Sequence, residues 1–243
     1  VVGKALAPYS PQLLLELVAL VGVAAVVVTT LAVYGIERRY RSATPAVADR
    51  AVPFRMGLAE IWAERRARHF TLFIFLSMTA YFMQELILEP YAGLSFGLTP
   101  GQSTQLSGAQ NGGVFVGMLL VGIAATGFKI GSLRVWIVTG CLGSALALLT
   151  LAALGQIPQG GTLLLPATVA LGLFNGMFAV AAIGSMMALA GEGRQAREGT
   201  RMGLWGASQA IAAGLGGLFG AAAVDIARYM TDDATAFGLV FTL

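Results

Sequence analysis

The sequence has few of the residues from which most soluble functional sites are built. Its 243 residues include one cysteine, Cys141, and one histidine, His69. A single cysteine excludes a disulfide within the chain and any zinc or iron–sulfur site made of cysteines, and a single histidine excludes a multi-histidine metal site. Charged residues make up only 11% of the chain, whereas soluble domains carry about 25%. The composition is therefore too poor in charge for an ordinary soluble domain.

Apolar residues and glycine are abundant instead. Hydrophobic residues make up 57% of the chain, and 32 of the 243 residues are glycine, against a usual glycine share of about 7%. This composition is typical of a membrane protein. The net charge of +3 would point to nucleic acid in a soluble basic protein, but here the placement of the charges matters more. We expect a lipid membrane and no nucleic acid as the environment of this chain.

Six apolar stretches are long enough to cross a bilayer as helices, which takes about 20 residues. They cover roughly 12–36, 70–94, 104–128, 134–155, 163–190 and 202–224. A seventh apolar stretch starts near residue 234 and stops at Leu243, which is too short to span. The sequence predicts an all-α polytopic membrane protein, and we expect the chain to be a portion of a longer one.

The positive charges lie on one side of the predicted membrane. Thirteen of the fifteen lysines and arginines fall in the loop 37–69 and in the next two loops on the same side, which hold Lys129, Arg134 and the arginines of 191–201. Loops in the cytoplasm carry such an excess. The arginine-rich loops are therefore predicted to be cytoplasmic, and the regular alternation supports the number of spans.

The long loop suggests how the chain is organised. Residues 42–53 have the character of a linker, and 54–70 reads as an amphipathic helix at the headgroup level, or else as a docking site for an acidic partner. One span, a long cytoplasmic loop and six more spans resemble the midpoint of a twelve-helix transporter of the major facilitator type. In that arrangement 1–36 contains the sixth helix, 37–69 is the cytoplasmic loop, and 70–243 is a C-terminal bundle whose last helix is truncated.

Glycines recur at four-residue spacing within the predicted spans. Such pairs let helix backbones approach closely in lipid, where little hydrophobic force holds helices together. We expect tight helix–helix packing at these pairs, although the same pattern could leave room for a flat ligand or for a helix of another protein. The pairs are Gly108/Gly112, Gly113/Gly117, Gly172/Gly176 and Gly216/Gly220.

Two carboxylates lie inside a predicted span. Glu85 and Glu89 share a helix face, and Pro90 is expected to kink or end the helix just after them, which would leave Glu89 at the interface. No lysine or arginine lies in any predicted span, and a charge in lipid is costly. We therefore expect Glu85 to be a neutral acid hydrogen-bonded to neighbouring amides. It could relay protons, ligate a metal-bearing ligand, or pair with a residue outside this chain. The amides considered are Gln110, Asn111 and Asn175.

The sequence contains no recognisable catalytic motif. It lacks the glycine loop followed by lysine that cradles phosphate, the GxSxG elbow and the HExxH metal motif. His69 could ligate the magnesium of a chlorin, but a lone histidine at the membrane interface is more often an ordinary surface residue. We predict that the chain is not an enzyme.

Three stretches resemble the PucC/LhaA family. They are MQELILEPYAG (83–93), FNGMFAVAAIGSMMALA (174–190) and REGTRMGLWGASQAIAAGLGGLFG (197–220). The resemblance implies a major facilitator fold and work in phototrophic bacteria, where the family assists assembly of light-harvesting antenna complexes and binds or delivers bacteriochlorophyll. It also implies a photosynthetic inner membrane as the location, with antenna polypeptides and the reaction centre–antenna complex as partners.

On this resemblance, a few polar residues become candidates for contact with pigment or partner. They are Gln84, Glu85, Glu89, Asn111 and Gln209. Two other functions stay open. A proton-coupled transporter would use Glu85 as its titrating group, and a purely structural scaffold would use the carboxylates only to lock helices together.

Overall fold

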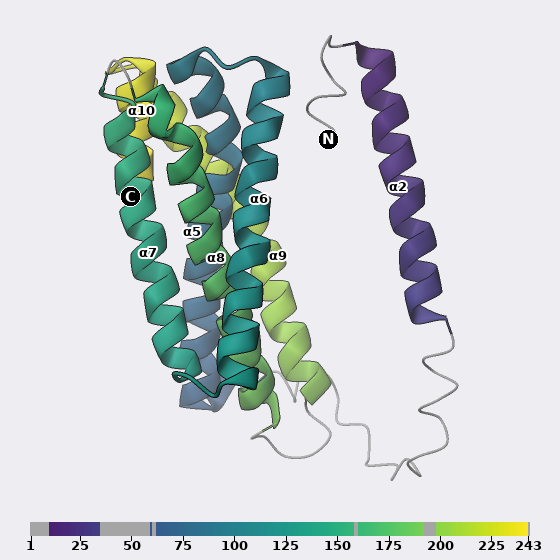
Figure 1. Cartoon of the computed structure of the whole chain (residues 1–243). Coiled ribbons are helices and arrows are strands. Elements are labelled where there is room, and N and C mark those ends of the chain that lie inside the picture. The colour runs from purple at the N-terminus through teal and green to yellow at the C-terminus, as the bar shows by residue number, and fades with distance from the viewer. Residues whose placement is uncertain (1–9, 35–58, 60–61, 158–159, 192–197, 243) are drawn as a thin grey trace.

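The computed structural model describes residues 10–34, 59, 62–157, 160–191 and 198–242, and these contain helices and no strands. Predictions for the linker 42–53 and for residues 54–58, 60 and 61 of the amphipathic segment fall outside the described residues. The helices, labelled as in Figure 1, are α2 (Pro11–Val33), α5 (Arg65–Phe96), α6 (Pro100–Gly122), α7 (Leu133–Leu154), α8 (Gly161–Gly191), α9 (Glu198–Arg228) and α10 (Asp233–Phe241), with a π-helical turn at Ile123–Gly127 after α6.

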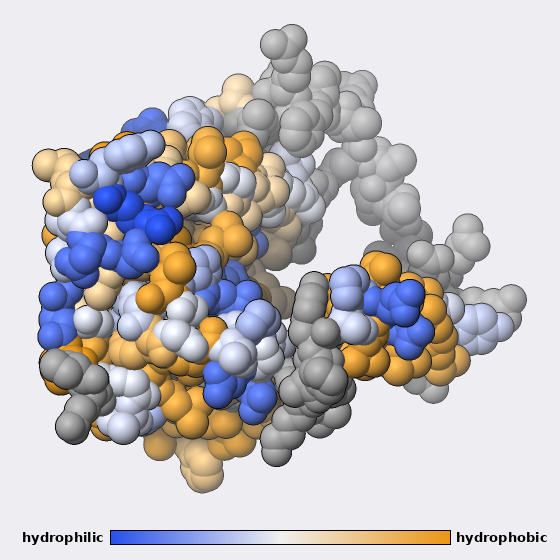
Figure 2. Space-filling model, turned by 90° about the horizontal axis from the view of Figure 1, so that it is seen from above, coloured by the Kyte–Doolittle hydropathy of each residue, from blue (hydrophilic) through white to orange (hydrophobic). Residues whose placement is uncertain are grey.

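Six of the described helices are long and apolar enough to cross a membrane. They correspond to the six predicted spans, so the prediction of an all-α polytopic membrane protein is confirmed. Their outer faces carry large exposed apolar side chains, for example Leu142 and Leu146 on α7. Figure 2, viewed onto one end of the molecule, shows hydrophilic residues on that end and hydrophobic residues along the sides, as expected for a lipid-facing surface.

Helix α5 departs from the predictions at both ends. It starts at Arg65, so the residues before Phe70 continue the spanning helix, and the chain is extended at Glu64. The helix also runs through Pro90 to Phe96 and ends where Gly97 adopts a φ of 67°. The expectation that Glu89 lies at a helix end was therefore wrong. Tyr91 and Ala92 are fully buried, and this packing holds the backbone helical although proline removes one hydrogen bond.

The bundle consists of two groups of helices (Figure 1). Helix α8 packs between α6 and α7, whereas α9 packs along α5. The short α10 lies at one end and contacts α5, α7 and α9. Direct contacts of α5 with α6 and of α8 with α9 are sparse by comparison. Helix α2 has no buried residue and stands apart from this bundle in Figure 1.

Glycine pairs form the closest contacts within each group. A methyl group added at Gly172 or Gly176 would lie 2.1 Å from the backbone oxygen of Gln110 or Val114 on α6. On α9, Gly216 meets the backbone of Thr79 on α5 in the same way, at 2.5 Å. Tight packing is confirmed at these positions, because no side chain larger than hydrogen fits.

Gly108 and Gly112 differ from the other pairs. A methyl group at either position would meet nothing within 4 Å among the described residues. This pair on α6 therefore faces away from the described bundle, and its four-residue spacing does not mark a contact seen here.

The positively charged residues gather at one end of the described bundle. The start of α5, the turn between α6 and α7, the end of α8 and the start of α9 all lie at the lower end in Figure 1. Arg65, Lys129, Arg134 and Arg201 belong to these segments, while Arg228 lies at the opposite end of α9. The helix arrangement therefore agrees with the alternation inferred from charge.

Candidate functional site

Both predicted carboxylates are exposed on α5. Glu89 accepts a hydrogen bond of 3.2 Å from the hydroxyl of Ser107 on α6. Asn111, one turn further along α6, is also exposed and donates to the backbone oxygen of Ser107 over 3.0 Å. We call Glu85, Glu89, Ser107 and Asn111 the acidic patch. The structure thus brings Glu89 and Asn111 to one serine, and Glu85 lies one turn from Glu89 on the same helix.

The hydrogen bonds expected for Glu85 do not form. In the described part of the chain, Glu85 bonds neither to Gln110 nor to Asn111 nor to Asn175, and no lysine or arginine pairs with either carboxylate of the patch. The reason is helical register: Gln84 is buried, whereas Glu85 is rotated by about 100° and exposed. The acidic patch therefore presents two carboxyl groups outward from the spanning helix α5, without a counter-charge among the described residues.

The open glycines adjoin the acidic patch. Gly108 follows Ser107 and Gly112 follows Asn111 on α6, and both are exposed. Absence of side chains at these positions leaves the α6 backbone accessible beside the carboxylates. Such a surface can accept a closely packed helix or the flat face of a ring, while the carboxyl groups supply hydrogen bonds or a ligand for a metal.

Gln84 and Asn175 face a pocket of about 420 Å³ between α5, α7, α8 and the end of α10. Both side chains are 6% exposed. The Oδ1 of Asn175 accepts from the hydroxyl of Ser144 over 2.8 Å. The remaining amide atoms, both of Gln84 and Nδ2 of Asn175, have no hydrogen-bond partner among the described residues. Each such buried group costs about 1–3 kcal/mol, so this pocket suits an occupant with polar groups.

The pocket does not fit a whole bacteriochlorophyll. Pockets for drug-sized ligands enclose about 300–1,000 Å³, and this one, at about 420 Å³, lies in the lower part of that range. A tetrapyrrole with its isoprenoid tail exceeds it. The acidic patch fits better, because an exposed carboxylate can reach the magnesium or a polar edge of a ring lying on the surface. Gln209 is half-buried on α9 and lines neither the pocket nor the acidic patch.

The described residues contain no group of three or more histidine, cysteine, aspartate or glutamate side chains that could hold a metal ion. A metal already held by a pigment needs only one ligand from the protein. The single carboxylates of the acidic patch meet that requirement, and an independent metal centre finds no site in the part of the chain that the structure describes.

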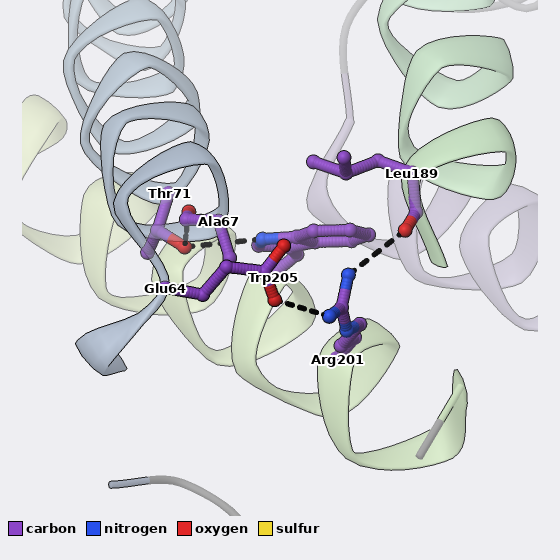
Figure 3. A network of polar contacts seen from close by, with 6 residues as sticks. All are labelled: Glu64, Ala67, Thr71, Leu189, Arg201 and Trp205. Carbon is purple, nitrogen blue, oxygen red and sulfur yellow. Dashed lines mark hydrogen bonds and ion pairs between the residues drawn. The ribbon is translucent and has the colours of Figure 1, made fainter. Parts of the chain in front are cut away.

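A network of polar contacts joins three helices at the arginine-rich end (Figure 3). The guanidinium of Arg201, which is 6% exposed, donates to the backbone oxygen of Leu189 over 2.9 Å and forms an ion pair with Glu64. One turn further, the indole of fully buried Trp205 donates to Thr71, whose hydroxyl donates to the backbone of Ala67 over 2.8 Å. The start of α5, the end of α8 and the start of α9 are held together here.

These contacts give the start of the 197–220 stretch a structural role, which is to join α9 to α5 and α8. Arg201 satisfies a carbonyl near the end of α8, and Trp205 fills the space between α9 and α5. Both residues belong to the stretch 197–220 that resembles the PucC/LhaA family, but nothing in the sequence indicated a network. Their spacing of four residues places them on one helix face. That spacing was the only feature of the sequence that could have indicated a shared role.

Tyr91 of the 83–93 stretch has a similar structural role at the opposite end. Its hydroxyl donates to the backbone oxygen of Leu151 on α7 over 2.5 Å. Its ring packs against Phe237 and Phe241 of α10. This tyrosine therefore connects α5 to α7 and α10. Of the polar residues before it in the stretch, Glu85 and Glu89 are exposed and Gln84 lines the pocket.

Comparison with known proteins identifies the family. The family model described as PUCC protein matches residues 1–243. The chain belongs to the PUCC family. The resemblance seen in its sequence is thereby confirmed over the whole chain. No solved structure matches it, so the major facilitator arrangement stays a prediction.

Three of the curated relatives come from Rhodobacter capsulatus and Cereibacter sphaeroides. The chain is 66% identical over 240 residues to the "Bacteriochlorophyll synthase 44.5 kDa chain" of Rhodobacter capsulatus, covering 99% of this chain and 55% of that protein. It is 28% identical over 218 residues to "Protein PucC" of the same species and 29% identical over 216 residues to "Protein PucC" of Cereibacter sphaeroides, covering 89% and 88% of this chain and 46% and 45% of those proteins. The chain spans about half the length of these relatives.

Proposed function

We propose that the chain is part of an assembly factor for bacterial light-harvesting antenna complexes, which binds or delivers bacteriochlorophyll, antenna polypeptides or both. The observation that carries this proposal is the acidic patch with its adjoining glycines. It presents two carboxyl groups of α5, beside open glycines of α6, toward the outside of the described bundle. Membership of the PUCC family and the pigment-related name of one relative support it.

In this proposal, an antenna polypeptide packs its transmembrane helix on Gly108 and Gly112. Glu85, Glu89 and Asn111 contact the polypeptide or the magnesium and polar edge of a pigment that it carries. Gln84 faces the pocket and Gln209 lies on α9, so contact of either with pigment or partner is a prediction separate from the acidic patch. The reaction centre–antenna complex is the larger partner, and the site of action is the photosynthetic inner membrane, with the arginine-rich loops in the cytoplasm.

The proposal does not include catalysis. One relative is named a synthase chain, but its name does not assign a reaction to these residues. The described residues offer exposed carboxylates and amides, which suit binding.

The test is co-purification from phototrophic cells in a mild detergent. The wild-type protein is expected to carry antenna polypeptides and the absorption bands of bacteriochlorophyll. A Glu85→Gln/Glu89→Gln variant should lose most of both while keeping its abundance in the membrane. The matched control is Glu16→Gln, an equal change at an exposed position of α2, which should retain both. Wild-type protein free of pigment and of antenna polypeptide would contradict the proposal.

Proton-coupled transport is distinguished by a separate measurement. A transporter that titrates Glu85 would take up substrate into liposomes in response to a pH gradient, and Glu85→Gln would abolish that uptake. The assembly proposal expects no gradient-driven uptake in either protein. It also expects antenna assembly to fail in the variant.

A further inference from the structure

A second hollow lies at the arginine-rich end, away from the acidic patch. It encloses about 940 Å³ between the start of α5, the start of α7 and the end of α8. Its charged or polar lining includes Arg66, His69, Arg134 and the hydroxyls of Ser132 and Ser185. The rest of the lining is mainly apolar. We call this hollow the basic groove. The apolar residues used below are Phe70, Phe73, Ile137 and Ala188.

The cations of the basic groove are placed by well-defined local structure. Ser132 caps α7 by accepting a hydrogen bond from the backbone of Val135 over 3.4 Å, which sets Arg134 in the first turn. The preceding turn is fastened by the indole of Trp136, which donates to the backbone oxygen of Ile130 over 3.0 Å. The first turn of α7 also points backbone N–H groups and its positive dipole toward this end.

On the opposite wall, Arg66 and His69 are three residues apart on α5 and therefore share a face. Phe70 and Phe73 continue from them toward the membrane interior. From α7, Ile137 lies one turn beyond Arg134. The α5 and α7 walls of the groove thus start with cationic or N–H-bearing groups at the end of the bundle and become apolar with depth.

We infer that the basic groove binds an anionic phospholipid of the leaflet on the arginine-rich side. Arg134, Arg66 and His69 contact the headgroup phosphate, and an acyl chain lies along Phe70, Phe73 and Ile137. Basic pockets between transmembrane helices on the cytoplasmic side characteristically bind anionic headgroups. The apolar depth of the groove selects a lipid over a free phosphate ion, because a phosphate alone would leave that surface uncovered.

Charge complementarity also favours the lipid over a protein partner. An acidic protein segment would meet the same cations but would have to bury polar backbone against the apolar wall. A lipid places its charge at the cations and its hydrocarbon at the aromatic rings. The groove opens where lipid headgroups lie, since it is formed by the ends of spanning helices.

The experiment measures lipid retained by the purified chain. Native mass spectrometry in a mild detergent with equal amounts of phosphatidylglycerol and phosphatidylcholine is expected to show preferential retention of phosphatidylglycerol. Arg134→Gln combined with His69→Ala should reduce that retention at least about tenfold. Arg65→Gln is the matched control, because Arg65 precedes Arg66 in the same turn but does not line the groove. It should retain the wild-type preference.

A second variant tests the apolar part of the groove. Ala188 lines it and is exposed, so Ala188→Trp should fill the space for the acyl chain and lower phosphatidylglycerol retention with all cations present. Inorganic phosphate should not displace the lipid from the wild-type protein. Arg134→Lys keeps the positive charge and should keep most of the binding. It serves as the comparison if the tryptophan variant does not fold.

Four results would overturn the inference. The first is equal retention of the two lipids by the wild type. The second is an unchanged preference in the Arg134/His69 double variant. The third is displacement by inorganic phosphate together with wild-type retention in Ala188→Trp, which would reveal a simple phosphate site. The fourth is a loss of phosphatidylglycerol in Arg65→Gln as large as in the double variant, because it would show that any positive charge near the surface, and not the groove, retains the lipid.

Discussion

The indole N–H of Trp205 donates a hydrogen bond of 3.1 Å to the hydroxyl of Thr71, across the contact between α9 and α5. Trp205 is fully buried and Thr71 is 4% exposed. Around them, Phe70 packs edge-on against the indole at a centroid distance of 5.2 Å. A polar contact enclosed by apolar groups in this way fixes how α9 sits on α5.

The first prediction concerns this contact. Thr71→Val keeps the shape of the side chain but leaves the indole N–H unpaired, so it should lower the free energy of unfolding by about 1–3 kcal/mol. Adding Trp205→Phe should cost less than the sum of the two single changes, because both remove one hydrogen bond. Thermal unfolding of the purified protein in detergent measures these effects. Trp62→Phe, at a position 44% exposed, should change little, and strictly additive effects would contradict the coupling.

The second prediction compares two glycines of α6 and α8. Gly176→Ala places a methyl group 2.1 Å from the backbone oxygen of Val114, so α6 and α8 must separate. We expect a loss of about 1–3 kcal/mol in stability. Gly112→Ala enters open space and should change stability by less than about 0.5 kcal/mol.

The two glycine variants also separate folding from binding. If the open glycine pair accepts an antenna helix, Gly112→Leu should reduce co-purified antenna polypeptide although the protein folds normally. Retention of the wild-type amount of antenna polypeptide by that variant would show that helices do not dock at this place.

The third prediction concerns the unpaired amide of Gln84. Gln84→Met replaces it with an apolar side chain of similar length, which removes the cost of two buried unpaired atoms. The purified chain should gain about 1–3 kcal/mol in stability. Gln105→Met on the exposed side of α6 is the control and should have little effect. A loss of stability in Gln84→Met would mean that something in the purified protein hydrogen-bonds this amide.

The fourth prediction is a pH dependence at the cap of α10. Hydrogen bonds from the hydroxyl and the backbone N–H of Thr235, at 2.7 and 3.2 Å, hold the pKa of the Asp232 carboxyl below its ordinary value. A lowered pKa in the folded state contributes stability above the ordinary value of 3.8, and this contribution is lost as the pH falls through the folded-state pKa.

Asp232→Asn keeps a capping side chain that does not titrate. The unfolding temperature of the wild type should therefore exceed that of the variant at neutral pH by a margin that shrinks toward about pH 2. A margin that widens on acidification would show that the hydrogen bonds from Thr235 do not favour the carboxylate.

Hydropathy and charge were sufficient to predict the spans and their alternation, because both depend on composition averaged over many residues. The boundaries of α5 were not predictable in this way. Arg65, Arg66 and Arg68 are polar, yet they extend the spanning helix. Pro90 is tolerated within the helix because the residues after it, Tyr91 and Ala92, are fully buried in the bundle. Packing of this kind is not visible in one sequence.

Adjacent polar residues set a second limit on prediction. Gln84 and Glu85 are neighbours in sequence, and the glutamate attracted attention because a carboxylate in lipid is costly. In the structure the glutamine is the buried residue with unpaired atoms, and the glutamate faces outward. Glycine spacing had the same ambiguity, since Gly108/Gly112 and Gly113/Gly117 are alike in sequence but only the second pair meets α8.

The two helix groups are joined near both ends, by the contacts of Tyr91 on α5 with Leu151 of α7 at one end and by the hydrogen bond from Arg201 on α9 to the backbone oxygen of Leu189 on α8 at the other. A movement of the α5–α9 pair relative to α6, α7 and α8 would have to break at least one of these contacts. The pocket lined by Gln84 lies between these two contacts along α5, so a ligand held there would bridge both helix groups.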